Sequence, residues 1–355
     1  MLKKVRQGEE LPELELKKFL IQNELLDHLE SELSVSQFST GFSNLTYLLE
    51  IENKAYVLRR PPRGAIKRGH DMGREYKVLK GLNQSFEKAP KVFVYTEDTE
   101  VIGAPFYLME KVEGIILTGA EAKHRQLGEK ELASISNCWL DTFIALHQLD
   151  FESIGLGDLG KPEGYVERQV RNWGKQYLKA ATEDIAEAHE VMKWLEEHQP
   201  KSYDHSLIHN DFKYDNVVFR DESWQSINAI LDWEMCTLGD PLMDLGTSLA
   251  YWTSASDHPI LLQSLPPSAT QLVGNPSRTE LVNLYAEKSG RSIHNLVFYY
   301  AYGLFKVAVI VQQIYYRYQK GLTKNEKFAQ LNQVCRLFCT MAWQAIEKQR
   351  IERLL

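Results

Sequence analysis

One polar run constrains this chain more than any other: His209-Asn210-Asp211-Phe212-Lys213-Tyr214-Asp215-Asn216. Another aspartate, Asp232, follows 21 residues after Asp211 and ends a short apolar run. The spacing His-x-Asp-x-x-x-x-Asn allows one loop to turn Asp211 and Asn216 to the same side. In phosphoryl transfer, one carboxylate accepts or orients the proton of the attacking hydroxyl, while an Asn and a second Asp hold Mg²⁺ against the nucleotide phosphates. The run therefore predicts a phosphoryl-transfer loop, and the alternative is a polar β-turn with a capping Asp and Asn.

The first third of the chain has the pattern of a small antiparallel sheet. Short runs rich in β-branched and aromatic residues are bounded by turn-type residues, which is typical of strands. After a Pro-Pro loop, a helix is expected with Val78, Leu79 and Leu82 on one face. The expected strands cover 35–38, 45–51, 55–60, 91–95 and 105–112.

From about residue 120 onward the apolar period becomes helical, so the rest of the chain is expected to be mainly α. A β-rich insert at 207–232 interrupts it with two short strands around a polar loop. Since no repeat or Gly/Ser linker separates the parts, two directly packed lobes are expected. The expected helices cover 129–149, 161–179, 184–198, 278–289, 294–318 and 324–348.

Composition disfavours several other classes of protein. The 355 residues carry a formal net charge of -7, so binding to nucleic acid is not expected. Four scattered cysteines predict neither a disulfide framework nor a zinc site. The N-terminus lacks the apolar run of a secretory signal, and the cytoplasm is the expected location. The apolar stretch 297–316 has Lys306 at its centre. A mid-membrane Lys costs about 2.5–3.5 kcal/mol, so a buried core helix is expected and no membrane partner.

Five segments carry a resemblance to a known family. They read Leu-Ile-His-Asn-Asp-Phe-Lys-Tyr-Asp-Asn at 207–216, Leu-Asp-Trp-Glu at 231–234, Thr-Leu-Gly-Asp-Pro-Leu-Met-Asp-Leu at 237–245, Val-Leu-Arg-Arg-Pro at 57–61 and Arg-Glu-Tyr-Lys-Val-Leu at 74–79. Together they resemble the aminoglycoside phosphotransferase and choline kinase-like enzymes, in the branch associated with acyl-CoA dehydrogenases.

This resemblance spans nearly the whole chain and implies an α+β, two-lobed protein-kinase-like fold. A small antiparallel β-sheet lobe over 1–112 would bind the nucleotide, and a larger, mainly α-helical lobe over 113–355 would carry catalysis and substrate binding. The implied cofactors are ATP and Mg²⁺. Asp211 would be the catalytic base, and Asn216 and Asp232 would be the Mg²⁺ ligands. For His209, a hydrogen bond to the backbone is the expected role.

The resemblance also implies residues that support the site. A kinase strand normally carries a Lys that pairs with the phosphates and with a helix Glu, and here Arg59 would take that place with Glu75 as its partner. Strand alternation permits only one of Arg59 and Arg60 to point inward. Asp240 would brace the catalytic loop, while Asp240 and Asp244 could equally cap the helix that follows.

The expected nucleotide contacts depart from the protein-kinase pattern. Only Gly41 remains of a Gly-rich loop, and Ser43 and Asn44 are candidates for phosphate contacts, although a plain hairpin turn also explains this segment. Glu110 and Val112 resemble the hinge whose backbone pairs with adenine, and an ordinary strand end has the same pattern.

Two features bear on the acceptor. Only seven residues separate Asp232 from Asp240, which leaves no room for a peptide-docking segment, so a small molecule is expected. Eight basic and two acidic residues lie between 59 and 80 in an otherwise acidic chain, which favours an anionic ligand such as coenzyme A. Arg168 and Arg171, on one predicted helix face, are candidate substrate contacts, with surface arginines as the alternative.

The sequence thus predicts an ATP- and Mg²⁺-dependent kinase with an alcohol group as acceptor. The branch resemblance implies a hydroxyacyl-CoA or hydroxy acid as substrate and a functional link to an acyl-CoA dehydrogenase. The alternatives are an aminoglycoside or choline-type kinase and a nucleotide-binding pseudokinase or scaffold.

Overall fold

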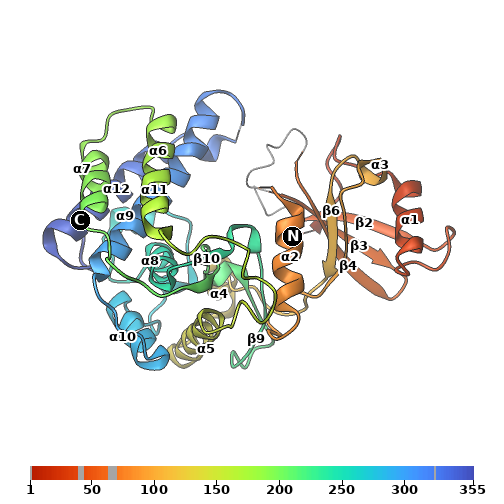
Figure 1. Cartoon of the computed structure of the whole chain (residues 1–355), viewed down its shortest axis with the longest axis horizontal. Coiled ribbons are helices and arrows are strands. Elements are labelled where there is room, and N and C mark those ends of the chain that lie inside the picture. The colour runs from red at the N-terminus through yellow and green to blue at the C-terminus, as the bar shows by residue number, and fades with distance from the viewer. Residues whose placement is uncertain (1, 39–43, 63–69, 324) are drawn as a thin grey trace. The chain divides into compact units, whose positions relative to one another are not determined.

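The computed structural model describes residues 2–38, 44–62, 70–323 and 325–355 (Figure 1). The chain divides into two compact units. Unit 1 comprises Met1–Gly114, Glu152–Leu159 and Asn228–Cys236, and unit 2 comprises Ile115–Phe151, Gly160–Ile227 and Thr237–Leu355. The first segment of unit 1 ends two residues beyond 112, where the sequence predicted the end of the first lobe. The order of elements along the chain does not indicate that its two later segments belong to unit 1.

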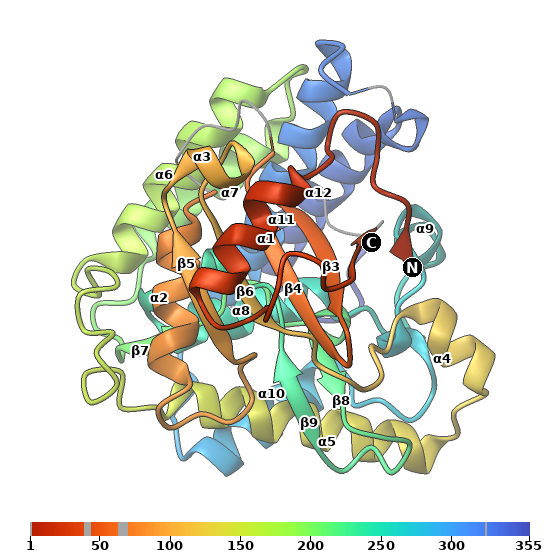
Figure 2. The ribbon, with the colours of Figure 1, turned by 90° about the vertical axis from the view of Figure 1, so that its right-hand side faces the viewer.

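A six-stranded antiparallel sheet forms the centre of unit 1, with strand order β1-β2-β3-β4-β6-β5 (Figure 2). All five expected strands are present; β6 ends two residues before the expected position, and β1 was not predicted. The strands are β1 (Leu2–Lys3), β2 (Leu33–Phe38), β3 (Leu45–Ile51), β4 (Lys54–Arg60), β5 (Val92–Thr96) and β6 (Phe106–Glu110).

Helices of unit 1 contact both faces of this sheet. They are α1 (Glu13–Gln22), α2 (Met72–Leu82) and α3 (Thr99–Ile102). Successive side chains of a strand point to opposite faces. On β6, Phe106 contacts the ring of Phe19 from α1, whereas Tyr107 contacts the ring of Tyr76 from α2. Arg59 on β4 is the register partner of Tyr107, so it lies on the α2 face.

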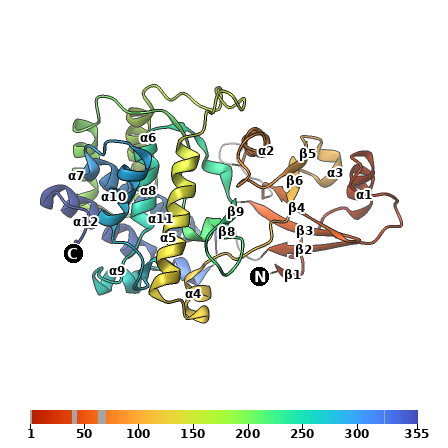
Figure 3. The same cartoon turned by 90° about the horizontal axis from the view of Figure 1, so that it is seen from below.

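Unit 2 is mainly helical, as the sequence predicts, and its long helix α5 is yellow in Figure 3. The last helix begins seven residues later than expected, and α4 and α9 are additional. The expected insert at 207–232 begins with β7 (Ser206–Ile208), which pairs antiparallel with an additional strand, β10 (Thr237–Gly239). In the chain between these two strands come β8 (Val217–Phe219) of unit 2 and β9 (Ile227–Ile230), most of which belongs to unit 1. The helices are α4 (Gly119–Arg125), α5 (Glu129–His147), α6 (Tyr165–Ala180), α7 (Ala186–Glu197), α8 (Pro241–Tyr251), α9 (Pro259–Ser264), α10 (Arg278–Ser289), α11 (Leu296–Gln319) and α12 (Leu331–Lys348).

Helix α11 lies in the core of unit 2. By length and composition it would be long and apolar enough to span a membrane, but 72% of that stretch is buried inside the structure, as predicted for a core helix. Helices α8 and α11 approach so closely that a Cβ on Gly303 would lie 2.1 Å from the carbonyl oxygen of Gly246. Glycine on both helices therefore brings the polar side chains of α8 next to α11.

Candidate active site

The predicted catalytic loop follows β7 and ends in a short 3₁₀ turn, Tyr214–Asn216. The Asp211 carboxylate accepts hydrogen bonds from Lys213 Nζ at 2.8 and 3.0 Å and from Asn216 Nδ2 at 2.8 Å. Asn216 Nδ2 also donates to the backbone oxygen of Asp211 at 2.9 Å. The predicted base and the predicted Mg²⁺ ligand therefore lie together, and the 16% exposure of the Asp211 side chain leaves the carboxylate accessible.

Lys213 is a further charged residue of this loop, and the sequence pattern did not indicate a role for it. Burial works against the charged amine, but the charges of Asp211, Tyr251 and Asp215 and the hydrogen bond to Asp211 together outweigh it and raise the pKa of Lys213. Lys213 Nζ also lies 4.8 Å from the centre of the Tyr251 ring, a cation–π distance. Its position two residues after the predicted base was the available signal.

The loop is braced by a buried carboxylate on α8. Asp244 accepts hydrogen bonds from the backbone N–H groups of His209 at 2.7 Å and Asn210 at 2.8 Å. It also lies 3.2 Å from His147 Nε2. Asp240 instead caps α8 by accepting from Leu242 N. The brace is therefore Asp244, and the proposed bracing role of Asp240 is corrected to that of a helix cap.

Burial and pairing shift the pKa values behind the loop in different directions. Burial lowers the pKa of His147, which favours the neutral imidazole. Burial would raise the pKa of Asp244, but the His147 hydrogen bond and nearby positive charge hold it below its ordinary value. Burial raises the pKa of Asp240 to about 6. Asp244 is thus ionised at neutral pH, as a carboxylate receiving two N–H donors should be.

In unit 1, Arg59 forms the predicted ion pair with Glu75 of α2, with 3.1 Å between Nη1 and Oε1. Its Nη2 lies 3.0 Å from Asp232 Oδ1 and 3.7 Å from Glu234 Oε2. Burial raises the pKa of Glu75, and the Arg59 charge opposes that rise. Arg60 points to the other face and donates to Ile102 O at 2.9 Å. Of the two arginines, it is therefore Arg59 that points toward Glu75 and Asp232.

Of the three loop residues predicted to contact phosphate, the structure describes Asn44. Gly41 and Ser43 lie outside the described residues. Asn44 is buried, and its Nδ2 donates to Glu234 Oε2 at 2.9 Å while its Oδ1 lies 2.9 Å from His70 Nδ1. The Asn44 amide is thus engaged with protein groups at both ends, and a phosphate contact would require it to exchange one of them.

The predicted hinge residues lie at the end of β6. Glu110 is the last residue of the strand, and its side chain accepts a hydrogen bond from Lys91 N at 2.9 Å. Val112 lies beyond the strand. The hinge role of Glu110 and Val112 stays a prediction.

The donor set predicted for Mg²⁺ has suitable chemistry. Mg²⁺ is usually held by one or two carboxylates together with waters and substrate phosphates. Asp232 offers a side chain that is 37% exposed, and its backbone is held in the left-handed region at φ 67°. The amide nitrogen of Asn216 is used toward Asp211, so Oδ1 is the oxygen that this side chain offers a cation. Within the described ranges, no group of three His, Cys, Asp or Glu is arranged to hold a metal.

The basic segment 59–80 is not an open positive patch in its described part. Arg60 is buried, Arg74 donates to the carbonyl oxygens of Leu159 at 2.6 Å and Cys236 at 3.0 Å, and Lys77 binds Asp158. Arg63, Lys67 and Arg68 lie outside the described residues. Counting charges along the sequence therefore overestimated the positive charge available to an anionic ligand.

The two candidate substrate arginines on α6 are engaged locally. Arg168 donates to the backbone oxygens of Lys161 and Glu163. Arg171 is exposed and lies 3.8 Å from Glu167, one helical turn away. These contacts match the surface alternative, and a substrate role for either arginine stays a prediction.

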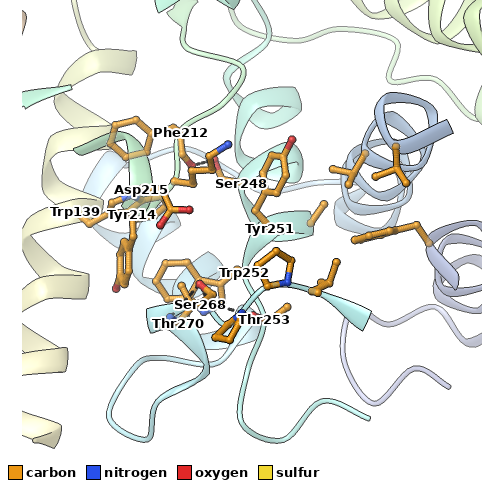
Figure 4. Close-up of a pocket in the computed structure, with 18 residues that line it drawn as sticks. Trp139, Phe212, Tyr214, Asp215, Ser248, Tyr251, Trp252, Thr253, Ser268 and Thr270 are labelled. Atoms are coloured by element: carbon orange, nitrogen blue, oxygen red, sulfur yellow. Dashed lines mark hydrogen bonds between the residues drawn. The ribbon is translucent and has the colours of Figure 1, made fainter. Parts of the chain in front are cut away.

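A cavity of about 260 Å³ adjoins the catalytic loop within unit 2 (Figure 4). Its walls come from the loop, α8, the segment 265–270, α11 and α12, and they are mostly apolar or aromatic. In Figure 4 the Asp215 carboxylate points into this space, with Tyr251 across from it. Burial raises the pKa of Asp215. The positive charge of Lys213 opposes that rise, and the negative charge of Asp211 adds to it. The cavity thus combines an apolar wall with one carboxylate and one amine.

The two-unit architecture is that of the kinase-like phosphotransferases. The profile of the phosphotransferase enzyme family, APH, matches residues 34–265, so the chain belongs to this family. A crystal structure provisionally assigned as an aminoglycoside phosphotransferase from Ralstonia eutropha is 29% identical with a TM-score of 0.78, covering 96% of this chain and 99% of that one. The GDP and kanamycin complex of APH(2″)-IIIa has a TM-score of 0.63 at 15% identity, covers 90% and 97%, and supports the fold alone.

Curated relatives are longer proteins. Acyl-CoA dehydrogenase family member 10 of Mus musculus is 32% identical over 97% of this chain and 32% of its own length. Acyl-CoA dehydrogenase family member 11 of Homo sapiens is 35% identical over 84% of this chain and 38% of its own length. The chain therefore spans about a third of the length of these relatives. Its similarity to them confirms the predicted resemblance to the branch associated with acyl-CoA dehydrogenases.

Proposed function

We propose that this protein is an ATP- and Mg²⁺-dependent kinase that transfers the γ-phosphoryl group to a hydroxyl of a small molecule. The observation that carries the proposal is the Asp211 carboxylate, accessible and held by Lys213 and Asn216. The acceptor oxygen would attack the γ-phosphorus as the bond to the bridging oxygen of ADP breaks, and its proton would pass to Asp211. Positioning and charge neutralisation would supply most of the rate enhancement.

Asn216 and Asp232 would hold the metal, each through an oxygen of the kind that Mg²⁺ prefers. When bound, Mg²⁺ neutralises the developing charge on the phosphates. Arg59 is buried against Glu75 and extends its second amine toward Asp232. This arrangement keeps Asp232 in one orientation, and it places a guanidinium where kinases carry a lysine.

For the acceptor, we propose a hydroxyacyl-CoA or a related hydroxy acid. The support is the similarity to acyl-CoA dehydrogenase family members and the apolar wall of the cavity beside Asp215. The mostly apolar wall of this cavity suits the aliphatic segment of an acyl group. A functional link to an acyl-CoA dehydrogenase is part of this proposal.

One observation favours a choline-type acceptor as the second candidate. Asp215 projects into a cavity that Tyr251 and Trp252 also line, and a carboxylate with aromatic rings is the chemistry that recognises a small cation. Lys213 in the same wall acts against it.

The test is ADP release from MgATP with hydroxyacyl-CoAs of graded length, free hydroxy acids, choline and kanamycin. Asp211→Ala is expected to abolish turnover and to retain ATP binding, whereas the control Asp141→Ala, at an exposed position of α5, is expected to keep both. Normal turnover in Asp211→Ala would refute the assignment. ATP binding without turnover on any acceptor would favour the scaffold alternative.

Two cavity variants distinguish the acceptor classes. Asp215→Asn removes the carboxylate and should raise KM for choline much more than KM for an acyl substrate. Val311→Phe reduces the volume at α11 and should exclude longer acyl chains first. An Asp215→Asn variant that loses affinity equally for both classes would show that neither assignment of this cavity holds.

A further inference from the structure

Lys306 is a buried cation with an unusual place in the fold. It lies at the centre of the apolar helix α11, and its side chain is 1% exposed. Its ammonium group donates to the backbone oxygen of Asn210 at 2.9 Å and to Asn210 Oδ1 at 2.9 Å, and it lies 3.5 Å from Thr247 Oγ1. Each of the three N–H donors of the ammonium group therefore has an oxygen atom within reach.

A buried ammonium group is destabilising unless its surroundings compensate it. Burial lowers the pKa of Lys306 to about 8, against the charges of Asp244 and Asp211, which raise it. The Trp173 ring lies 5.9 Å from Nζ and adds a weak cation–π contact. An apolar residue would fill the same space in the helix at less electrostatic cost, so stability alone does not account for a lysine here.

The contacts of Lys306 converge on the peptide bond that precedes Asp211. The oxygen of that peptide accepts from Lys306, and its N–H, which belongs to Asp211, donates to His209 Nδ1 at 3.3 Å. The N–H of Asn210 is held by Asp244 on the other side. Asn210 has φ 68°, in the left-handed region, which asparagine adopts more readily than most residues other than glycine. Lys306 and Asp244 together hold this conformation from two helices.

We propose that Lys306 is a positioning residue that orients the peptide before Asp211 and thereby aims the Asp211 carboxylate at the acceptor hydroxyl. The inference rests on the proposed function of Asp211. Lys306 does not itself contact substrate, so its role is to keep the proton acceptor within the narrow geometry that proton transfer requires.

The test compares Lys306→Met and Lys306→Gln with wild type. A displacement of about 1 Å at a reacting group can reduce the rate about 100-fold, so Lys306→Met is expected to lower kcat by about 10- to 100-fold. KM for ATP is expected to change by less than about twofold, because only transition-state geometry is altered. Lys306→Gln keeps an amide donor and should give an intermediate loss.

The matched control is Gln312→Met on the same helix. Gln312 is equally buried, and its Nε2 donates to Ala180 O at 2.8 Å and Thr182 Oγ1 at 3.0 Å, away from the catalytic loop. Both methionine variants remove buried hydrogen bonds, but only Lys306→Met should reduce kcat per folded molecule. An equal loss in Gln312→Met would overturn the proposal.

A second readout is independent of the acceptor and of turnover. Amide hydrogen exchange at Asn210 and Asp211 should accelerate in Lys306→Met and stay at the wild-type rate in Gln312→Met. Unchanged exchange at both amides would overturn the positioning role of Lys306. Faster exchange in a protein whose wild type shows no turnover would instead refute the proposed function and leave the structural role intact. If Lys306→Met does not fold, Lys306→Gln provides both measurements.

Discussion

Removal of the Asp244 carboxylate tests whether the brace behind the catalytic loop acts as the structure indicates. The carboxylate accepts two short backbone hydrogen bonds, from His209 and Asn210, and is itself fully buried. Asp244→Ala removes both acceptors, whereas Asp244→Asn keeps one oxygen and turns an N–H₂ group toward a second donor. The alanine variant should therefore be the more damaging of the two.

The magnitude follows from the two N–H groups. Each buried donor that loses its acceptor costs about 1–3 kcal/mol, so Asp244→Ala should lower the unfolding free energy by about 2–6 kcal/mol. For a unit of this size, each kcal/mol lowers Tm by about 2–4 °C, which gives a shift of about 10 °C near the middle of that range. Asp244→Asn should cost about half as much.

The assay combines thermal unfolding by circular dichroism with kcat per folded molecule. The control is Asp257→Asn, which breaks another buried ion pair, 2.7 Å from Arg278, without contact to the catalytic loop. Both variants should melt earlier, but only the Asp244 variants should lose turnover after correction for folded protein. A melting point for Asp244→Ala within about 2 °C of wild type would refute the reasoning about the two donors.

Three further outcomes are expected. Arg59→Lys should weaken MgATP binding almost as much as Arg59→Met, since one ammonium cannot reproduce the fork that reaches two carboxylates, and calorimetry that finds full affinity for Arg59→Lys would contradict this. Asp240 has a folded-state pKa of about 6 against an ordinary 3.8, so the folded state holds the proton more tightly and stability falls as pH rises from about 4 to 6. Asp240→Asn should remove this pH dependence of the unfolding free energy, which urea unfolding curves at several pH values would measure. Gly246→Ala places a Cβ 2.1 Å from Tyr299 O and should destabilise by about 1–3 kcal/mol, whereas Gly174→Ala, with ordinary contacts inside a helix, should not.

Much of the fold could be predicted from local patterns. Runs of β-branched and aromatic residues correctly predicted five strands of unit 1, and strand alternation placed Arg59 and Arg60 on opposite faces. The proximity of Asp211 and Asn216 could be predicted because the two residues are close in sequence and one turn sets their spacing. The prediction succeeded where the contacts that define a feature are formed by neighbouring residues.

The failures have a common physical origin. Asp240 and Asp244 are four residues apart and chemically identical, and only the contact of α8 with β7 decides which one braces the loop. The basic segment 59–80 looked like an anion site because its partners, such as Asp158 and the backbone oxygen of Leu159, come from distant parts of the chain. Sequence shows a charge and does not show what neutralises it.

The balance of charge around Arg59 bears on whether the protein is a kinase or a scaffold. One guanidinium lies within 3.7 Å of three carboxylates, those of Glu75, Asp232 and Glu234. In the proposed kinase, Asp232 would bind Mg²⁺ through a carboxylate oxygen while Glu75 keeps Arg59 in place beside it. A scaffold that binds nucleotide without a metal needs no carboxylate oxygen at position 232. The carboxylates beside Arg59 therefore support the proposed kinase over the scaffold alternative.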